Sequence, residues 1–134
     1  MEPRYVMLRL YPNQDLKRSL IEFCKNKGIQ SGAIVSAVGS FSTMRVRIAD
    51  GKSMVEDTQN RELLSLSGTL TDGSVHLHVS AINSTMEILG GHLMEGCIIH
   101  TTLELVILDL SELYENKREL DPLTGYDELV VIPR

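Results

Sequence analysis

The feature that most constrains the fold is a pair of stretches, residues 62–70 and 74–82, separated by a very short connection. The second stretch alternates apolar and polar residues, which is the period of a strand with one buried face. The connection contains Asp72 and Gly73, and an Asp-Gly pair readily adopts the positive φ angles of tight hairpin turns. We therefore predict an antiparallel hairpin here, and a fold in which strands dominate.

Further strands are predicted on both sides of this hairpin. They are expected at residues 5–11, at residues 32–48 with an interruption at Gly39, at residues 97–110 and at residues 126–132. Residues 50–60 are polar and irregular, which predicts a loop or a short edge segment. Residues 111–125 form a charged tail before the last strand.

One helix is predicted, over residues 15–27. Its apolar residues fall at positions i, i+4, i+7 and i+8, which form one stripe on a helix surface. Asn13 or Asp15 can cap its first turn, and Gly28 suits the position after its last turn. Several strands with one helix predict an α/β chain of the α+β type, in which a largely antiparallel sheet carries a flanking helix. The chain length of 134 residues fits one domain, residues 1–134.

The charge of the chain is unevenly distributed. The net charge is −5, but residues 1–52 carry nine Lys/Arg and four Asp/Glu, whereas residues 53–134 carry four Lys/Arg and fourteen Asp/Glu. A protein that binds DNA by itself usually has a strong basic surface, because phosphate contacts supply much of its affinity. This makes direct DNA binding doubtful and leaves only a local basic face in the N-terminal part.

The two cysteines, Cys24 and Cys97, fall in apolar contexts that are typical of buried free thiols. The first eleven residues alternate and contain Arg4 and Arg9, unlike a signal peptide. The apolar runs are far shorter than the roughly 20 residues of a membrane helix. We therefore expect a soluble, cytoplasmic protein without a membrane partner.

Three histidines carry the most distinctive polar chemistry of the chain. His76 and His78 alternate with apolar residues, so both point to one face of a strand, about 6.5 Å apart at Cα. His92 follows Gly90-Gly91, which is a flexible pair or a close backbone approach, and the absence of side chains lets a turn fold closely over that strand. Three histidines with an open fourth position form the kind of Zn²⁺ site that activates water or binds a small ligand. The alternative is a solvated or hydrogen-bonded His-x-His pair.

Five other residues are candidates for the same site. His100, Thr102 and Glu104 share one face of the strand at residues 97–110. If this strand lies near the histidines, Glu104 is a candidate fourth ligand, orienter of an imidazole, or general base. The alternative is that Glu104 pairs with an arginine in the sheet. Arg61 and Arg118 are candidate anion contacts, or structural residues at strand ends.

An ordered series of short motifs runs along nearly the whole chain. The motifs are residues 61–70, 72–73, 76–80, 90–93, 96–97, 101–104 and 124–129, together with Arg118 and Asp121. In this order they resemble the PPC domain, the plants and prokaryotes conserved domain, in its stand-alone prokaryotic form. The resemblance implies an α/β fold with an antiparallel sheet and a homotrimeric assembly. It also implies a Zn²⁺-type histidine cluster, which falls on His76, His78 and His92.

The resemblance bears on DNA binding in two ways. In plants an AT-hook precedes the domain and binds DNA, while the domain itself mediates oligomerisation and contacts with other nuclear proteins. Prokaryotic members stand alone and are often described as DNA-binding by analogy. This chain has no Arg-Gly-Arg core of an AT-hook, which weakens the DNA interpretation.

Three functional hypotheses follow. The first is a homotrimeric interaction module with a regulatory role, which binds zinc or another divalent metal and contacts itself and other proteins. The second is a metal-dependent enzyme acting on a small molecule, with Glu104 as base or beside a ligand. The third is a direct DNA-binding protein. We favour the first, and so expect a protein that is not an enzyme.

Overall fold

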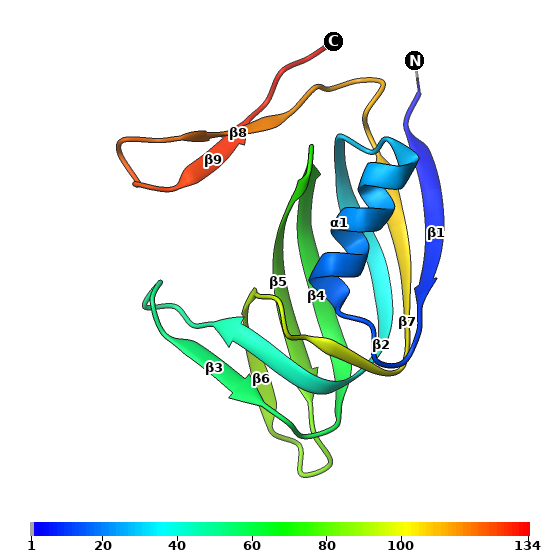
Figure 1. The fold of residues 1–134 in the computed structure, drawn as a ribbon, viewed down its shortest axis with the longest axis vertical. Coiled ribbons are helices and arrows are strands. Elements are labelled where there is room, and N and C mark those ends of the chain that lie inside the picture. The colour runs from blue at the N-terminus through cyan, green and yellow to red at the C-terminus, as the bar shows by residue number, and fades with distance from the viewer. Residues whose placement is uncertain (1) are drawn as a thin grey trace.

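The computed structural model describes residues 2–134, and Met1 lies outside them. The described residues contain one helix and nine strands (Figure 1). The elements in chain order are β1 (Arg4–Leu10), α1 (Leu16–Lys27), β2 (Ser31–Arg47), β3 (Met54–Asp57), β4 (Arg61–Thr71), β5 (Ser74–Ile82), β6 (Ile88–Leu93), β7 (Ile98–Asp109), β8 (Lys117–Leu120) and β9 (Asp127–Val130).

The main sheet has seven antiparallel strands within the described chain. Six follow the order β1-β7-β2-β4-β5-β6, and β3 pairs with β2. Strand β2 is long enough to pair with different strands along its length. Its first part pairs with β7 and β4, whereas Val46 and Arg47 pair with β6. Strands β2, β4, β5 and β6 therefore close into a ring. Strands β8 and β9 form a separate hairpin that extends beyond the sheet (Figure 1).

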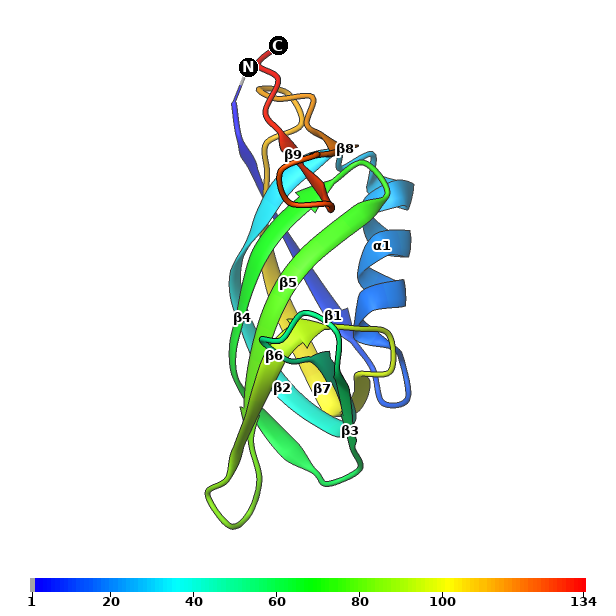
Figure 2. The same cartoon turned by 90° about the vertical axis from the view of Figure 1, so that its left-hand side faces the viewer.

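Helix α1 covers one face of the sheet (Figure 2). Leu16, Leu20 and Cys24 are its buried residues, and they join a core of aliphatic side chains from the strands. Asp15 caps the helix by accepting from the Arg18 N–H, and Gly28 ends it with φ 69°. The predicted helix and its boundaries are thus confirmed, as is the α+β architecture of a largely antiparallel sheet with one flanking helix.

The predicted hairpin is β4–β5, and its two-residue turn is Asp72-Gly73. Val75, Leu77 and Val79 are buried on the helix side of β5. The histidines between them therefore stand on the opposite side, which we call the outer face of the sheet.

Two predictions about glycines were wrong. The predicted break at Gly39 is absent, because β2 continues through this residue and accommodates it by a shift in register with β7. Gly90 and Gly91 do not form a turn but lie inside β6, although the close backbone approach predicted as an alternative is confirmed. A Cβ on Gly91 would stand 2.7 Å from the carbonyl oxygen of Arg47, so the missing side chain allows β6 to approach β2.

The irregular segments contain more pairing than the sequence suggested. The polar stretch 50–60 includes the short edge strand β3, one of its two predicted forms, and the charged tail includes β8. Cys24 and Cys97 are buried free thiols, as expected, and burial raises the pKa of each to about 11. Among residues 2–134, no helix is both long and apolar enough to cross a membrane.

Candidate metal centre

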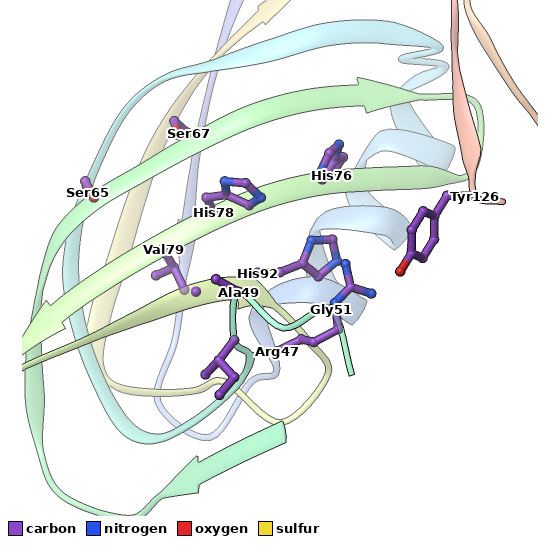
Figure 3. Close-up of a pocket in the computed structure, with 12 residues that line it drawn as sticks. Arg47, Ala49, Gly51, Ser65, Ser67, His76, His78, Val79, His92 and Tyr126 are labelled. Atoms are coloured by element: carbon purple, nitrogen blue, oxygen red, sulfur yellow. The ribbon is translucent and has the colours of Figure 1, made fainter. Parts of the chain in front are cut away.

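His76, His78 and His92 lie together on the outer face, and we call them the histidine cluster (Figure 3). Their ring centroids are 5.3 Å apart for His76 and His78, 5.2 Å for His76 and His92, and 5.8 Å for His78 and His92. One ring nitrogen from each can be chosen so that all three lie within 4.8 Å of one another. The sequence prediction that these three residues meet is therefore matched by their positions.

Sheet register brings the cluster together. His78 is the direct cross-strand partner of His92, so their side chains leave the sheet on the same face. His76 is two residues before His78 and shares that face. Gly91 keeps β6 close to β2 and Gly90 keeps it close to β5, because neither position has room for a Cβ.

The surroundings of the cluster favour neutral imidazoles. Burial, followed by the nearby positive charge of Arg47, lowers the pKa of His92 to about 4. Burial and the charge of Arg118 also lower the pKa of His76. A metal binds the neutral form of histidine, so both shifts prepare ring nitrogens for coordination at neutral pH.

The donor set fits a zinc-like ion. The Nδ1 atom of His92 is buried and has no hydrogen-bond partner in the described chain. A buried polar atom without a partner is costly, and coordination of an ion by the cluster removes that cost if this nitrogen is the ligand. Around a tetrahedral Zn²⁺, ligand nitrogens stand about 3.4 Å apart. The present spread is up to 4.8 Å, so the three rings would have to move closer together to hold the ion.

A cavity of about 510 Å³ opens beside the cluster, and we call it the histidine cavity (Figure 3). It is lined by the three histidines together with Arg47, Ile48, Ala49, Gly51, Ser65, Ser67, Val79, Gly91 and Tyr126. The Arg47 guanidinium carbon lies 5.8 Å from the centre of the Tyr126 ring. An ion held by three imidazoles would thus have its free coordination position next to a cavity that is lined by both polar and apolar residues.

Arg118 is the one further candidate that lies beside the cluster. It extends from β8 and donates from Nη2 to Thr69 Oγ1 over 3.1 Å. Thr69 is the cross-strand partner of His76. Arg118 also lines a second cavity that contains His76, His92, Asp127 and Glu128.

Glu104 and Thr102 lie elsewhere on the outer face. They belong to β7, and β2 and β4 separate that strand from β5. Glu104 lies opposite Arg9 in the sheet, and Thr102 accepts a hydrogen bond from Arg9 Nε over 3.0 Å. Within one chain, the structure therefore does not bring Glu104 to the histidine cluster.

His100 and Arg61 meet in a different cavity of about 580 Å³. Arg61 is buried, and its guanidinium donates to Asp57 Oδ2 over 2.7 Å and to the carbonyl oxygen of Glu87 over 2.6 Å. These contacts occupy the guanidinium and favour the structural interpretation of Arg61. The Nδ1 atom of His100 is 3.0 Å from the Thr101 hydroxyl.

Sequence reasoning gave no role to Arg47, although it lines the histidine cavity. The only local signal was its place on the polar side of the alternating stretch 44–48. What brings it to the site is its pairing with His92 at the end of β2, a contact across 45 residues of sequence that no local pattern encodes.

One family model matches most of the chain. The family model of the Plants and Prokaryotes Conserved (PCC) domain matches residues 2–111. Two proteins from Synechococcus strains, both named bifunctional protein GlmU, are 42% and 43% identical to the chain over 126 residues. The match covers 94% of this chain and 20% of each relative, so the chain spans about a fifth of the length of these curated relatives.

Three solved structures resemble the whole chain. A hypothetical protein from Salmonella enterica is 34% identical with a TM-score of 0.94, covering 99% of this chain and 96% of that chain. A candidate DNA-binding protein from Bacteroides thetaiotaomicron is 25% identical with a TM-score of 0.82, covering 94% and 91%. A protein from Archaeoglobus fulgidus described as metal-containing is 27% identical with a TM-score of 0.72, covering 95% and 93%.

Proposed function

Because this chain belongs to the Plants and Prokaryotes Conserved (PCC) domain family, we propose that it is a metal-binding interaction module of that family, with the histidine cluster as the protein ligands of one divalent ion. The observation that carries this proposal is the convergence of three ring nitrogens to within 4.8 Å, one histidine having a buried Nδ1 without a partner. The Archaeoglobus relative is described as metal-containing, which supports the same function.

Zinc is the proposed ion. Three imidazoles suit Zn²⁺ among the common divalent ions, and they leave one position of a tetrahedron open. The ion would supply Lewis acidity and an attachment point for one further oxygen or nitrogen ligand. The protein holds the three rings on adjacent strands and keeps two of them neutral.

Self-association into a trimer is the second part of the proposal. The resemblance to the family suggested it, and a group of exposed apolar side chains supports it. Tyr5 and Met7 of β1 are 70% and 76% exposed, and Val35 and Val38 of β2 are 52% and 58% exposed. Met7 and Val38 stand on the outer face on either side of β7, where a second copy can cover them.

Metal analysis of the purified protein tests the metal function. Protein isolated without added zinc is expected to contain close to one ion per chain, whereas His76→Ala and His92→Ala should contain little. His100→Ala is the matched control, because His100 is an exposed histidine on β7 outside the cluster, and it should retain the ion. Equal, near-zero metal in all four proteins would overturn the proposal.

The enzyme alternative rests on one observation, the histidine cavity beside the open metal position. A role for Glu104 in it would need a contribution from another subunit, since Glu104 does not line this cavity in its own chain. Hydrolysis assays therefore need the assembled protein. Turnover that Glu104→Gln leaves unchanged would exclude Glu104 as the base.

Direct DNA binding is supported by the description of relatives such as the Bacteroides protein, and not by the residues of the site. The chain's net charge of −5 opposes it. Binding to duplex DNA that does not change with salt concentration would exclude phosphate contacts, and an absence of binding at low salt would exclude this alternative.

A further inference from the structure

We propose that the histidine cavity binds a small organic molecule through an oxyanion group, a carboxylate or a phosphate, which is shared between the metal and Arg47. This inference rests on the proposed metal centre, because the ion supplies one of the two attachment points. It adds a ligand class and a specificity residue to that centre.

Arg47 has free hydrogen-bond donors directed at the site. Within residues 2–134 its guanidinium makes no ion pair, unlike Arg4, Arg18, Arg61 and Arg134. Its guanidinium instead lies over the face of the Tyr126 ring. A guanidinium presents a planar set of N–H donors that matches carboxylate and phosphate oxygens. Arg47 is therefore equipped to bind an oxyanion, since no carboxylate among residues 2–134 lies within ion-pair distance of it.

Sheet register fixes Arg47 next to the metal position. Arg47 pairs directly with His92 across β2 and β6, so both side chains leave the sheet on the outer face. In Figure 3 the Arg47 side chain extends toward the His92 ring at the edge of the cavity. An oxyanion bound at the open position of the ion can accept hydrogen bonds from this guanidinium with its remaining oxygen atoms.

The charges around the cavity favour an anion. Histidine binds a metal as the neutral imidazole, so the three ligands would not compensate the charge of a divalent ion. Two acidic residues near the cluster, Asp127 and Glu128, are balanced by the two arginines, Arg47 and Arg118, that line the same adjoining cavity. The charge of the ion is thus left uncompensated, and an anionic ligand would neutralise it in a partly desolvated site.

The shape of the cavity indicates a small organic molecule. A volume of about 510 Å³ falls in the range of roughly 300–1,000 Å³ that is usual for small-molecule sites. Ile48 and Ala49 provide apolar wall, and Tyr126 provides an aromatic one. A single inorganic ion would leave most of this space to water, whereas a molecule with an apolar body next to its charged group would fill it.

Cobalt-loaded protein allows the ligand to be observed directly. Visible absorption of Co²⁺ at the cluster changes when an oxygen ligand enters its coordination, so titration measures binding without any assay of activity. The two probes are propionate, for a carboxylate, and methylphosphonate, for a phosphate group. We expect at least one to bind saturably to the wild-type protein, and the stronger of the two identifies the class of oxyanion.

Arg47→Met should lower the affinity for the tighter-binding probe by about tenfold or more, because a charge-assisted hydrogen bond is lost. Arg47→Lys keeps the charge without the planar donors and should fall in between. Arg45→Met is the matched control, since it removes the same charge from the same strand but from a residue that does not line the histidine cavity. It should bind the probe like the wild type.

The possible results separate this inference from the proposed function. If all variants retain cobalt but neither probe binds, or Arg47→Met binds as tightly as Arg45→Met, the oxyanion site is wrong and the metal centre stands. If the wild type itself does not retain cobalt, the metal centre fails, and the oxyanion site that rests on it fails too.

Discussion

At the scale of single residues, His92 differs from an ordinary histidine because it is held neutral. Burial and the charge of Arg47 lower its pKa to about 4, whereas a histidine in an unfolded chain titrates near 6.5. Between these two pH values the unfolded chain binds a proton at this position and the folded chain does not. The free energy of unfolding of the metal-free protein is therefore expected to fall as the pH drops from about 6.5 to about 4.

The glutamine variant isolates this effect from other titrations. His92→Gln cannot take up the proton, so it should lose less stability than the wild type between pH 7 and pH 5. Urea unfolding of both metal-free proteins at these two pH values measures the difference. Equal losses in the two proteins would show that His92 titrates normally in the folded state.

Arg61 illustrates a residue whose role the sequence left open. Its side chain is buried, and it joins β4 to Asp57 at the end of β3 and to the carbonyl oxygen of Glu87 before β6. Arg61→Met would leave Asp57 and this carbonyl without their partner, at a cost of about 3 kcal/mol in the free energy of unfolding. Chemical denaturation measures this cost, and a change below about 0.5 kcal/mol would contradict the structural role.

At the scale of the elements, Gly91 is what allows the site to form. Alanine at this position would bring a Cβ to 2.7 Å from the Arg47 carbonyl oxygen, and backbone on both strands would have to move. Because the same pairing sets Arg47 beside His92, Gly91→Ala is expected to weaken metal binding at least tenfold. It should also destabilise the fold by about 1–3 kcal/mol.

A helix variant separates these two consequences. Gly28 has φ 69°, but a Cβ there would meet nothing within 4 Å, so Gly28→Ala costs about 1 kcal/mol through backbone strain alone. It should leave metal binding unchanged, as measured by competition with a chromophoric chelator. If both variants lost metal equally, general destabilisation and not the β2–β6 contact would explain the loss.

Strand β6 shows which parts of the fold could not be predicted from the sequence. Local patterns were sufficient for α1, with its cap at Asp15, and for the β4–β5 hairpin, because each depends on residues close in sequence. They also placed His76 and His78 on one face. The strand character of β6 was not visible, since Gly90 and Gly91 have low strand propensity and are tolerated there only because other strands approach closely.

At the scale of the whole molecule, the two faces of the sheet have different roles. The side packed against α1 contains the core, while the outer face has the histidine cluster at β5 and β6 and apolar side chains at β1 and β2. Glu104 lies on that face between the apolar residues, and it is too far away in the sheet to reach the histidine cluster of its own chain. Only an assembly of several chains could bring it to a metal, so its role depends on how the outer face is covered.

If other copies of the chain cover the outer face, a charge placed on that face should lower the mass of the assembled protein. Val38 is 58% exposed and lies opposite Glu104 of β7, so a single folded chain should tolerate Val38→Lys next to that carboxylate. In an assembly the added charge would have to be buried, and self-association should weaken strongly.

Met86→Lys is the control, since Met86 is a 79% exposed apolar residue in the β5–β6 connection. Sedimentation equilibrium should give three times the chain mass for the wild type and Met86→Lys, and a smaller mass for Val38→Lys. A wild-type mass of one chain, or an unchanged trimer in Val38→Lys, would show that this face is not the surface of assembly.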